Sequence, residues 1–265
     1  MKTSALLPGV IATASEAARF IQKERNNFSY SSVEQKGLND LVSYVDREAE
    51  KLIVESLRRL FPAAGFITEE ETATEKADYN WIIDPLDGTT NFIHGIPGYA
   101  VSIALEHQQQ IVLGVVYEIS RDECFSAHLN EGAFLNGKKI GVSSRSSLSE
   151  ALIGTGFPVS NFTRLQSFLK GLTYFIQHTH GVRRIGAAAP DLCYVACGRL
   201  DAFFEYNLNA WDVAAGALIL KEAGGSVQDF SGGENWLFGR EIACTNGKLQ
   251  KEFMQKIREF FAASS

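Results

Sequence analysis

The spacing of apolar residues changes at Phe66, and this change constrains the fold of the chain more than any other feature. Before it, apolar residues recur every three or four positions over about the first 25 residues and again from Val42 to Leu60. This spacing predicts two amphipathic helices, the second ended by Pro62. After it come short runs rich in β-branched residues, which predict strands. These runs are Phe66-Ile67, Trp81–Ile83, Tyr99–Leu105 and Ile111–Tyr117, the last two joined as a hairpin.

A serine-rich tract, Ser143–Ser149, predicts a boundary between an N-terminal half, 1–145, and a C-terminal half, 146–265. Beyond the tract strands and helices alternate, which indicates an α/β half. The expected strands are 152–154 and 202–204, and the expected helices are about 164–177, one from Pro190, 212–223 and 248–261. The fold class is therefore α+β to α/β in one compact unit, in which a mainly antiparallel sheet precedes the α/β half. The stretch 36–40 reads as a polar loop between the first two helices.

Two carboxylates, Asp84 and Asp87, come straight after the buried strand that begins at Trp81. Pro85 and Gly88 favour a turn, so we expect the strand to end at Asp84 and the turn to bring both carboxylates to one side. Carboxylates bind hard cations such as Mg²⁺, and the N–H groups of a helix start bind phosphate. The stretch predicts a metal-assisted phosphate site; the alternative is an acidic surface turn.

Three other positions are candidates for the same site, each with a plain alternative. One glutamate of Glu69–Glu71 would lie at the end of a strand, beside the end of the Trp81 strand, or the run is a solvated patch. Asp212 precedes a run of small residues and either caps a helix or binds the metal. Glu205, in an aromatic strand, is either a surface residue or a polar contact at a pocket rim. Thr89 either caps a helix that begins near Asn91 or orients a metal-bound water.

The charge and the remaining motifs exclude several other functions. A net charge of −6 and a pI near 5.5 argue against broad nucleic-acid binding. The sequence shows neither a signal peptide nor a membrane-spanning run, so a cytoplasmic location is expected. The four cysteines are too few for a disulfide framework, and the motifs of serine hydrolases, P-loop enzymes and zinc proteases are missing.

Four segments together resemble the signatures of the inositol monophosphatase family, in the right order and over nearly the whole chain. They are Thr68–Glu70, Asp84–Phe92, Arg183–Asp201 and Trp211–Gly216. The resemblance implies a layered αβαβα fold, Mg²⁺ as cofactor, lithium sensitivity, a homodimer, and a small phosphorylated polyol or similar substrate. From the charge and the lack of a long apolar run, no nucleic-acid or membrane partner is expected.

The resemblance also assigns roles to individual residues. Glu69, Asp84, Asp87, Asp212 and the main-chain carbonyl of Leu86 would hold magnesium. Glu69 and Thr89 would position and deprotonate the attacking water, with Asp46 supporting Thr89. Lys36 would lie near a loop that completes a third metal position. The residues implied for the substrate are Leu86, Asp87, Gly88, Thr89, Gly186, Ala187, Ala188, Glu205 and Asp212.

The identity of the substrate depends on positions where the chain departs from the family pattern. Ala187 stands where a hydroxyl residue is often found, and Asn207 stands in place of a glycine near Glu205. Thr68 replaces the usual glycine before the glutamates. Inositol monophosphate, hydrolysed to myo-inositol and phosphate, is the leading substrate. The alternatives are 3′-phosphoadenosine 5′-phosphate, fructose 1,6-bisphosphate, NADP or histidinol phosphate, and a non-catalytic phosphate-binding regulator.

Overall fold

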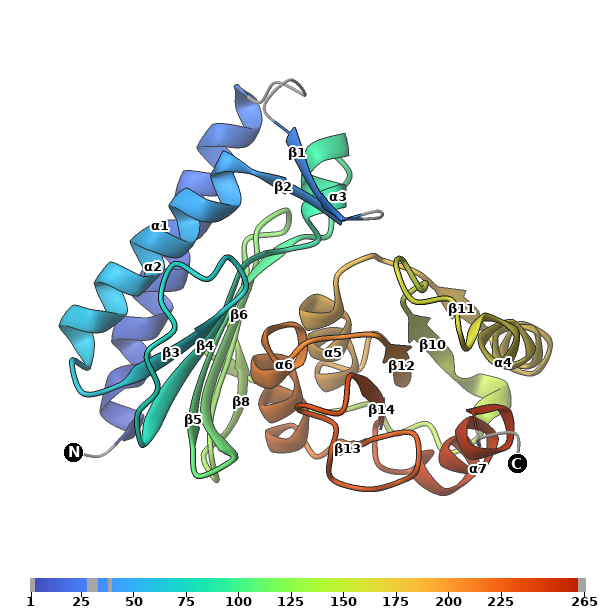
Figure 1. Cartoon of the computed structure of the whole chain (residues 1–265). Helices are drawn as coiled ribbons and strands as arrows, with labels where there is room; N and C mark the ends of the chain where they lie inside the picture. Colours follow the sequence, from blue (N-terminus) through green and yellow to red (C-terminus); the bar gives the residue numbers. More distant parts are fainter. Residues whose placement is uncertain (1–2, 28–32, 38–39, 262–265) are drawn as a thin grey trace.

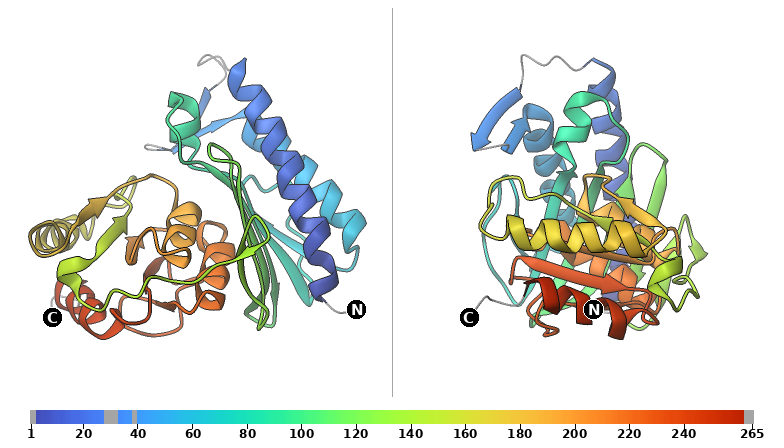
Figure 2. Two further views of the ribbon diagram at one scale, coloured as in Figure 1. Left: turned by 180° about the vertical axis from the view of Figure 1, so that it is seen from behind. Right: turned by 90° about the vertical axis from the view of Figure 1, so that its right-hand side faces the viewer.

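The computed structural model describes residues 3–27, 33–37 and 40–261, and these form five stacked layers (Figure 1). Two helices cover the outer face of one sheet, two helices fill the space between this sheet and a second one, and two more helices cover the far side of the second sheet (Figure 2). This αβαβα order confirms the architecture that the sequence predicts. Three buried apolar clusters fill the four interfaces between these layers, because one cluster surrounds the middle helices and reaches both sheets.

Within the described residues, the first sheet has seven strands in the order β3-β4-β5-β6-β7-β8-β9. Only β3 and β4 run parallel, so the prediction of a mainly antiparallel sheet is confirmed. The strands are β3 (Gly65–Thr68), β4 (Tyr79–Asp87), β5 (Ala100–His107), β6 (Gln110–Glu118), β7 (Glu123–His128), β8 (Gly132–Leu135) and β9 (Lys138–Lys139).

Helices α1 (Leu7–Asn26), which follows the short 3-10 helix η1 (Thr3–Leu6), and α2 (Tyr44–Leu60) cover the outer face of this sheet. Both bury one apolar face, as their spacing predicts. The second helix begins at Tyr44 rather than at Val42, because Ser43 and Asp46 form a capping box at its start.

The stretch 36–40, which we expected to be a loop, takes part in a two-stranded ribbon. Strands β1 (Val33–Gly37) and β2 (Asp40–Ser43) pair antiparallel, while residues 38 and 39 lie outside the described part. The polar sequence misled the prediction because such a ribbon is held by main-chain hydrogen bonds and needs no apolar face.

The second sheet has, among the described residues, the strand order β11-β10-β12-β14-β13. It mixes parallel and antiparallel pairs, whereas the sequence predicted only that strands and helices alternate in this half. The strands are β10 (Leu152–Thr155), β11 (Gly181–Arg183), β12 (Ala202–Tyr206), β13 (Ser226–Gln228) and β14 (Glu241–Thr245).

Helices α4 (Leu165–His178) and α7 (Gln250–Phe261) cover the far side of the second sheet, and α5 (Ala188–Ala196) and α6 (Ala210–Glu222) lie between the two sheets. Helices α5 and α6 each begin two residues earlier in the chain than the sequence predicts. A capping box at Asn209 sets the start of α6, and nearly all of this helix is buried.

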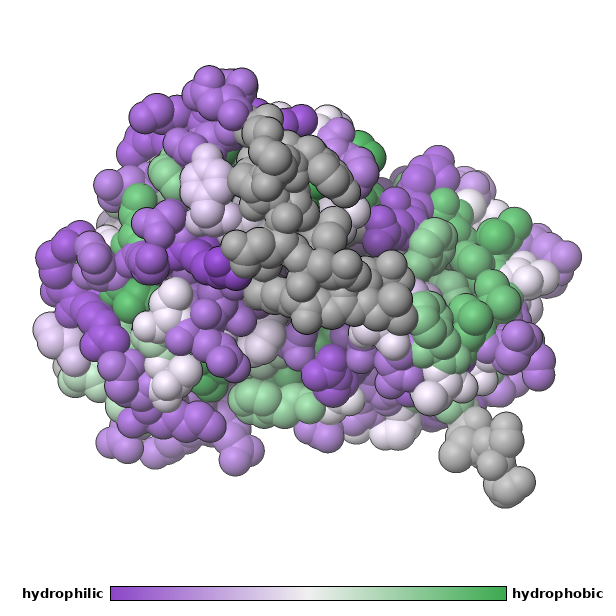
Figure 3. Space-filling model, turned by 45° about the horizontal axis from the view of Figure 1, so that its top comes forward, coloured by the Kyte–Doolittle hydropathy of each residue, from purple (hydrophilic) through white to green (hydrophobic). Residues whose placement is uncertain are grey.

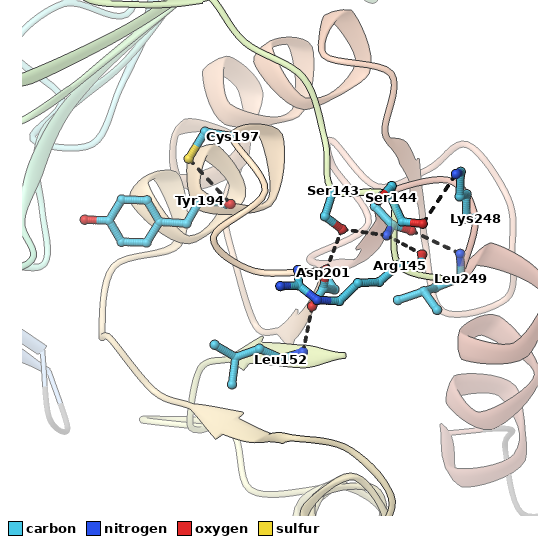
Figure 4. Close-up of polar contacts among 10 residues, drawn as sticks. Ser143, Ser144, Arg145, Leu152, Tyr194, Cys197, Asp201, Lys248 and Leu249 are labelled. Carbon is cyan, nitrogen blue, oxygen red and sulfur yellow. Dashed lines mark hydrogen bonds and ion pairs between the residues drawn. The ribbon is translucent and has the colours of Figure 1, made fainter. Parts of the chain in front are cut away.

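A strap of residues 140–147 connects the two sheets, and the carboxylate of Asp201 ties it down (Figure 4). This buried carboxylate accepts hydrogen bonds from the hydroxyl of Ser143, from the guanidinium of Arg145 at 3.0 Å and from the N–H of Leu152 at 2.8 Å. The serine-rich tract is therefore bonded to the second sheet, and a division at residue 145 stays a prediction. Across the described residues, no helix is long and apolar enough to cross a membrane.

Candidate functional site

Glu69 lies beside Asp84 because β3 runs parallel to β4 and ends next to Ile83. Thr68 is paired with Ile83, and the N–H of Glu69 donates to the carbonyl of Ile83 at 3.2 Å. The two side chains also hydrogen-bond each other. The end of β3 thus brings the carboxyl group of Glu69 to that of Asp84, as the sequence predicts, although Asp84 lies within β4 and not at its end.

Strand β4 continues to Asp87, which corrects the expectation that it ends at Asp84. Its pairing with β5 shifts between these two residues, so the chain bulges at Pro85, which has no N–H to donate. The N–H of Leu86 turns inward and donates to Oδ1 of Asp84 at 2.9 Å. The bulge leaves both carboxyl groups buried, with Asp84 2% and Asp87 9% exposed.

Two helix starts bring further groups to these acids. Asp212 lies in the first turn of α6, where its Oδ2 accepts the N–H of Asn209 at 2.6 Å, and it shares a hydrogen bond with Asp84. Asp87 accepts the N–H of Ala189, in the first turn of α5, at 2.7 Å. Helix starts carry partial positive charge, which favours carboxylates there.

Three of the clustered acids, Asp84, Asp87 and Asp212, have pKa values above the ordinary range of an aspartate. Burial, and then the charges of its three acidic neighbours, raise the pKa of Asp84 well above its usual range. Burial raises the pKa of Asp212 to about 6, against the hydrogen bond from Asn209. For Asp87, burial and the charge of Asp212 raise the pKa, and the N–H of Ala189 opposes the rise.

The donor set at this cluster consists of carboxyl oxygens, which suits a hard dication such as Mg²⁺. A dication would also relieve the mutual repulsion that raises these pKa values. Over the described ranges, however, no group of three or more His, Cys, Asp or Glu side chains has an arrangement that could hold a metal ion. The assignment of the predicted residues as metal ligands therefore stays a prediction.

Thr89 is the first residue of α3 (Thr89–His94), with Gly88 as the N-cap, so it does not cap a helix near Asn91 as one reading proposed. Its hydroxyl donates to Oδ1 of Asp46 at 2.9 Å and lies 3.0 Å from the carbonyl oxygen of Leu86. Burial raises the pKa of Asp46, whereas hydrogen bonds from Ser43 and Thr89 lower it. The pairing of Thr89 with Asp46 is the one implied by the family resemblance.

Gly88 fits its place only because it has no side chain. Its φ is +90°, and a Cβ atom would lie 2.9 Å from the carbonyl oxygen of Gly98 and 3.1 Å from Cβ of Ala187. This close approach places the first turn of α3 against the start of α5. Asn91 stabilises the same arrangement, because its Nδ2 donates to the carbonyls of Gly98 at 2.7 Å and of Ile185 at 2.9 Å.

Most of the predicted site residues line one cavity of about 350 Å³. Glu69, Asp87, Gly88, Thr89 and Asp212 line one side, and Gly186, Ala187, Ala188 and Glu205 line the other. Asp84, Leu86 and Asp46 are buried outside this lining. Lys36 lies in β1, but its side chain is outside the described part, so its role stays a prediction.

Glu205 lines the cavity wall formed by the end of β12. Burial, followed by the charges of Asp212 and Asp87, raises the pKa of Glu205 well above its ordinary value. Its carboxyl lies flat against Gly156, where a Cβ atom would be 1.8 to 2.2 Å from the carboxyl atoms. The structure thus supports the reading of Glu205 as a polar contact at the pocket.

Several residues near the site were missed from the sequence. Buried Glu50 accepts the N–H groups of Glu70 at 2.8 Å and Thr72 at 2.9 Å, so it fixes the loop that carries Glu69. Its position four residues after Asp46 on the inward face of α2 was the available signal. The other missed residues are Phe157, Arg184 and Arg240, which line the cavity, and the buried Asp191.

The proteins to which the chain is similar fall into two groups by name. It is 42% identical to the inositol-1-monophosphatase of Mesorhizobium japonicum, over 99% of this chain and 100% of that protein. It is 43% identical to the Nus factor SuhB of Pseudomonas aeruginosa, over 94% of both chains. The crystal structure of the extragenic suppressor protein suhB from Bartonella henselae matches with a TM-score of 0.91 and 39% identity, covering 96% of this chain and 99% of that one.

The family model described as the inositol monophosphatase family matches residues 3–261, which is almost the entire chain. Together with relatives above 40% identity, this match agrees with the arrangement of acids around the cavity. The chain belongs to the inositol monophosphatase family.

Proposed function

We propose that the protein is a Mg²⁺-dependent phosphomonoesterase that hydrolyses inositol monophosphate to myo-inositol and phosphate. The observation that carries the proposal is the convergence of Glu69, Asp84, Asp87 and Asp212 from three separate segments beside the start of α3. Four mutually repelling acids, three at the wall of one cavity and Asp84 buried behind them, serve no purpose in packing, whereas they suit a dication and a phosphate.

Each predicted residue has a task in this reaction. Magnesium held by the four carboxylates and the carbonyl of Leu86 would neutralise phosphate charge and lower the pKa of a bound water. The hydroxyl of Thr89 donates a hydrogen bond to Asp46. The oxygen of this hydroxyl can therefore accept a hydrogen bond from the attacking water. Glu69, on the cavity wall, takes the proton that this water loses. The backbone of Gly88 and Thr89, at the start of α3, binds the phosphate.

The opposite wall would receive the alcohol. Gly186, Ala187 and Ala188 present little side-chain bulk, which leaves room for a ring. Glu205 offers carboxylate oxygens that accept hydrogen bonds from hydroxyl groups, which favours a polyol over an apolar alcohol.

The proposal is tested with variants that keep the shape of the site. Asp87→Asn and Glu69→Gln should abolish phosphate release from inositol 1-phosphate in the presence of Mg²⁺, with the thermal midpoint retained or raised, because each removes one of the repelling charges. Phosphate release at the wild-type rate by either variant would show that the site is assigned wrongly.

A panel of esters separates the substrate alternatives. The predicted order puts inositol 1-phosphate ahead of 3′-phosphoadenosine 5′-phosphate, fructose 1,6-bisphosphate, NADP and histidinol phosphate in kcat/KM. Some relatives are named Nus factor SuhB instead of phosphatase, so a regulator that binds without turnover is the second candidate. Tight Mg²⁺-dependent binding of the panel without release of phosphate would favour the regulator.

We further propose a homodimer, formed through the apolar surface at the α4 end of the molecule. Figure 3 shows apolar side chains gathered at that end. Large exposed ones are Phe157, Val159, Phe162, Leu169 and Ile176, which are 41% to 57% exposed. Patches of this kind commonly mark a protein interface. Light scattering should give a molar mass twice that of the single chain. The Ile176→Glu variant should have a mass closer to that of a monomer.

A further inference from the structure

A second cavity, which we call the hairpin cavity, lies at the other end of α6 from the acidic cluster. Its volume is about 400 Å³, and it lies between the β5–β6 turn, the last turn of α6 and the loop before β14. Asp212 stands in the first turn of α6 and Lys221 in the last, which puts them about 14 Å apart along the helix. The two cavities are therefore separate.

The floor of the hairpin cavity is apolar. Ile111, Leu218, Trp236 and Leu237 line it, and each is at most 8% exposed. A cavity of several hundred Å³ with an aromatic wall is typical of sites for small organic molecules. The floor therefore suits a flat or branched apolar body.

Lys221 supplies the polar group of the cavity. Its ammonium lies 4.6 Å from the ring centre of Trp236, and partial burial lowers its pKa, against the opposite effect of Glu234. Within the described part of the chain, the Lys221 ammonium makes no hydrogen bond and no ion pair. A cation with three N–H donors and only an aromatic face beside it is suited to an anion.

The two carboxylates that line the cavity, Glu222 and Glu234, form no ion pair with Lys221, although the charge of Glu234 acts on it. The carboxylate of Glu222 is already occupied, since it accepts the N–H groups of Asn130 and Gly132 at 2.8 Å each. Glu234 is exposed at the mouth. Among the residues that line the cavity, Lys221 is therefore the cation that an entering anion would meet, past the repelling charge of Glu234.

The turn at the mouth is held in a costly conformation. Gln108 and Gln109 both have positive φ, +52° and +65°, where glycine or asparagine is usual. The buried carboxylate of Glu106 holds the turn by accepting the N–H of Gln109 and, at 2.9 Å, the side-chain amide of Asn80. Strain of this kind gathers at functional sites, and here it fixes Gln109 and Gln110 at the cavity wall.

We propose that the hairpin cavity is a second binding site, which takes a small aromatic carboxylic acid. The carboxylate of the ligand pairs with Lys221, and its ring packs on Trp236 and the neighbouring aliphatic side chains. This site is independent of the proposed phosphatase activity.

Calorimetric titration of the full-length protein tests the site with 1-naphthoate, a flat aromatic anion, and with the neutral 1-naphthamide. The wild type should bind one naphthoate, roughly tenfold more tightly than the amide, because a charged hydrogen bond adds more than 1 kcal/mol. Lys221→Met keeps the aliphatic stem on Trp236 and should remove this preference. Lys221→Arg should keep it.

Two further variants fix the location of the bound acid. Glu234→Gln removes a repelling charge and should strengthen naphthoate binding. Lys170→Met, at an exposed position on α4, should leave binding unchanged. Equal naphthoate affinity in the wild type and Lys221→Met, no saturable binding at millimolar concentration, or displacement of naphthoate by inorganic phosphate would each overturn the proposal.

Discussion

The hydroxyl of Thr89 donates to Oδ1 of Asp46 across 2.9 Å, although 43 residues separate them in the chain. Asp46 is 1% exposed and accepts two more hydrogen bonds from Ser43, at 2.9 Å from its N–H and 2.7 Å from its hydroxyl. These bonds hold the carboxylate rigidly, and through it they hold the hydroxyl at the cavity.

Replacing Asp46 by Asn should lower kcat for inositol 1-phosphate by roughly a hundredfold, because an amide withdraws the Thr89 proton less strongly. KM should change little, since Asp46 does not line the cavity. Steady-state kinetics at saturating Mg²⁺ measure both. Thr89→Ser, which keeps the hydroxyl, serves as the control and should stay within a few-fold of the wild type. A kcat that is unchanged in Asp46→Asn would contradict the role.

The acidic cluster should make the metal-free protein less stable as the pH rises. The pKa of Asp212 is about 6 in the fold against an ordinary value of 3.8, so the folded state binds the extra proton between these values. Stability is therefore greatest below this window and is lost as the pH rises through about 6. Urea unfolding with a chelator should show this loss in the wild type and a smaller loss in Asp212→Asn.

Magnesium should reverse the same loss. Above pH 6 the cluster is more ionised, so a dication that binds only the folded state should raise the unfolding midpoint more there than below the window. A magnesium effect that is equal on both sides of the window would argue against the cluster as its site.

Gly156→Ala should damage recognition of the alcohol. The added methyl group would lie within 2.2 Å of the Glu205 carboxyl and must push it out of place. We expect KM for inositol 1-phosphate to rise several-fold while kcat falls less, because the acids around the metal position are untouched. Gly141→Ala is the matched control, since its nearest new contact is an ordinary 3.7 Å. Equal KM values in the two variants would contradict the role of Glu205.

Glu50→Gln should disturb the loop that carries Glu69. Glu50 accepts the N–H groups of Glu70 and Thr72 and the Thr72 hydroxyl, the last at 2.7 Å, and an amide can accept from only one of its two ends. We expect a loss of about 1–3 kcal/mol in stability and a clear loss of activity. Glu48→Gln, in an exposed ion pair with Lys51 on the same helix, should change neither. Full activity in Glu50→Gln would show that the loop does not need this anchor.

The sequence predicts those parts of the fold in which one periodic pattern decides the structure. Both long helices and the β5–β6 hairpin follow from such patterns. The proximity of Glu69 and Asp84 was also predictable, because it required only that two strands consecutive in the sequence pair side by side. The bulge at Pro85 was not, since it depends on how β5 resumes pairing after it.

Buried polar residues were harder to foresee. The position of Glu50 on the inward face of α2 indicates burial, but only the folded loop opposite supplies the three donors that stabilise a buried carboxylate there. The ribbon of β1 and β2 likewise has no apolar alternation to reveal it. In both cases the stabilising partner comes from a part of the chain that local patterns do not reach.

Asp46 and Asp212 each occupy the third position of a helix capping box as well as a place at the site. A random substitution at either position therefore removes a helix cap and a functional group in a single event. In a genetic screen these two positions should look like folding defects, with low protein abundance hiding the catalytic loss. Only purified variants, compared at equal folded concentration, would separate the two causes.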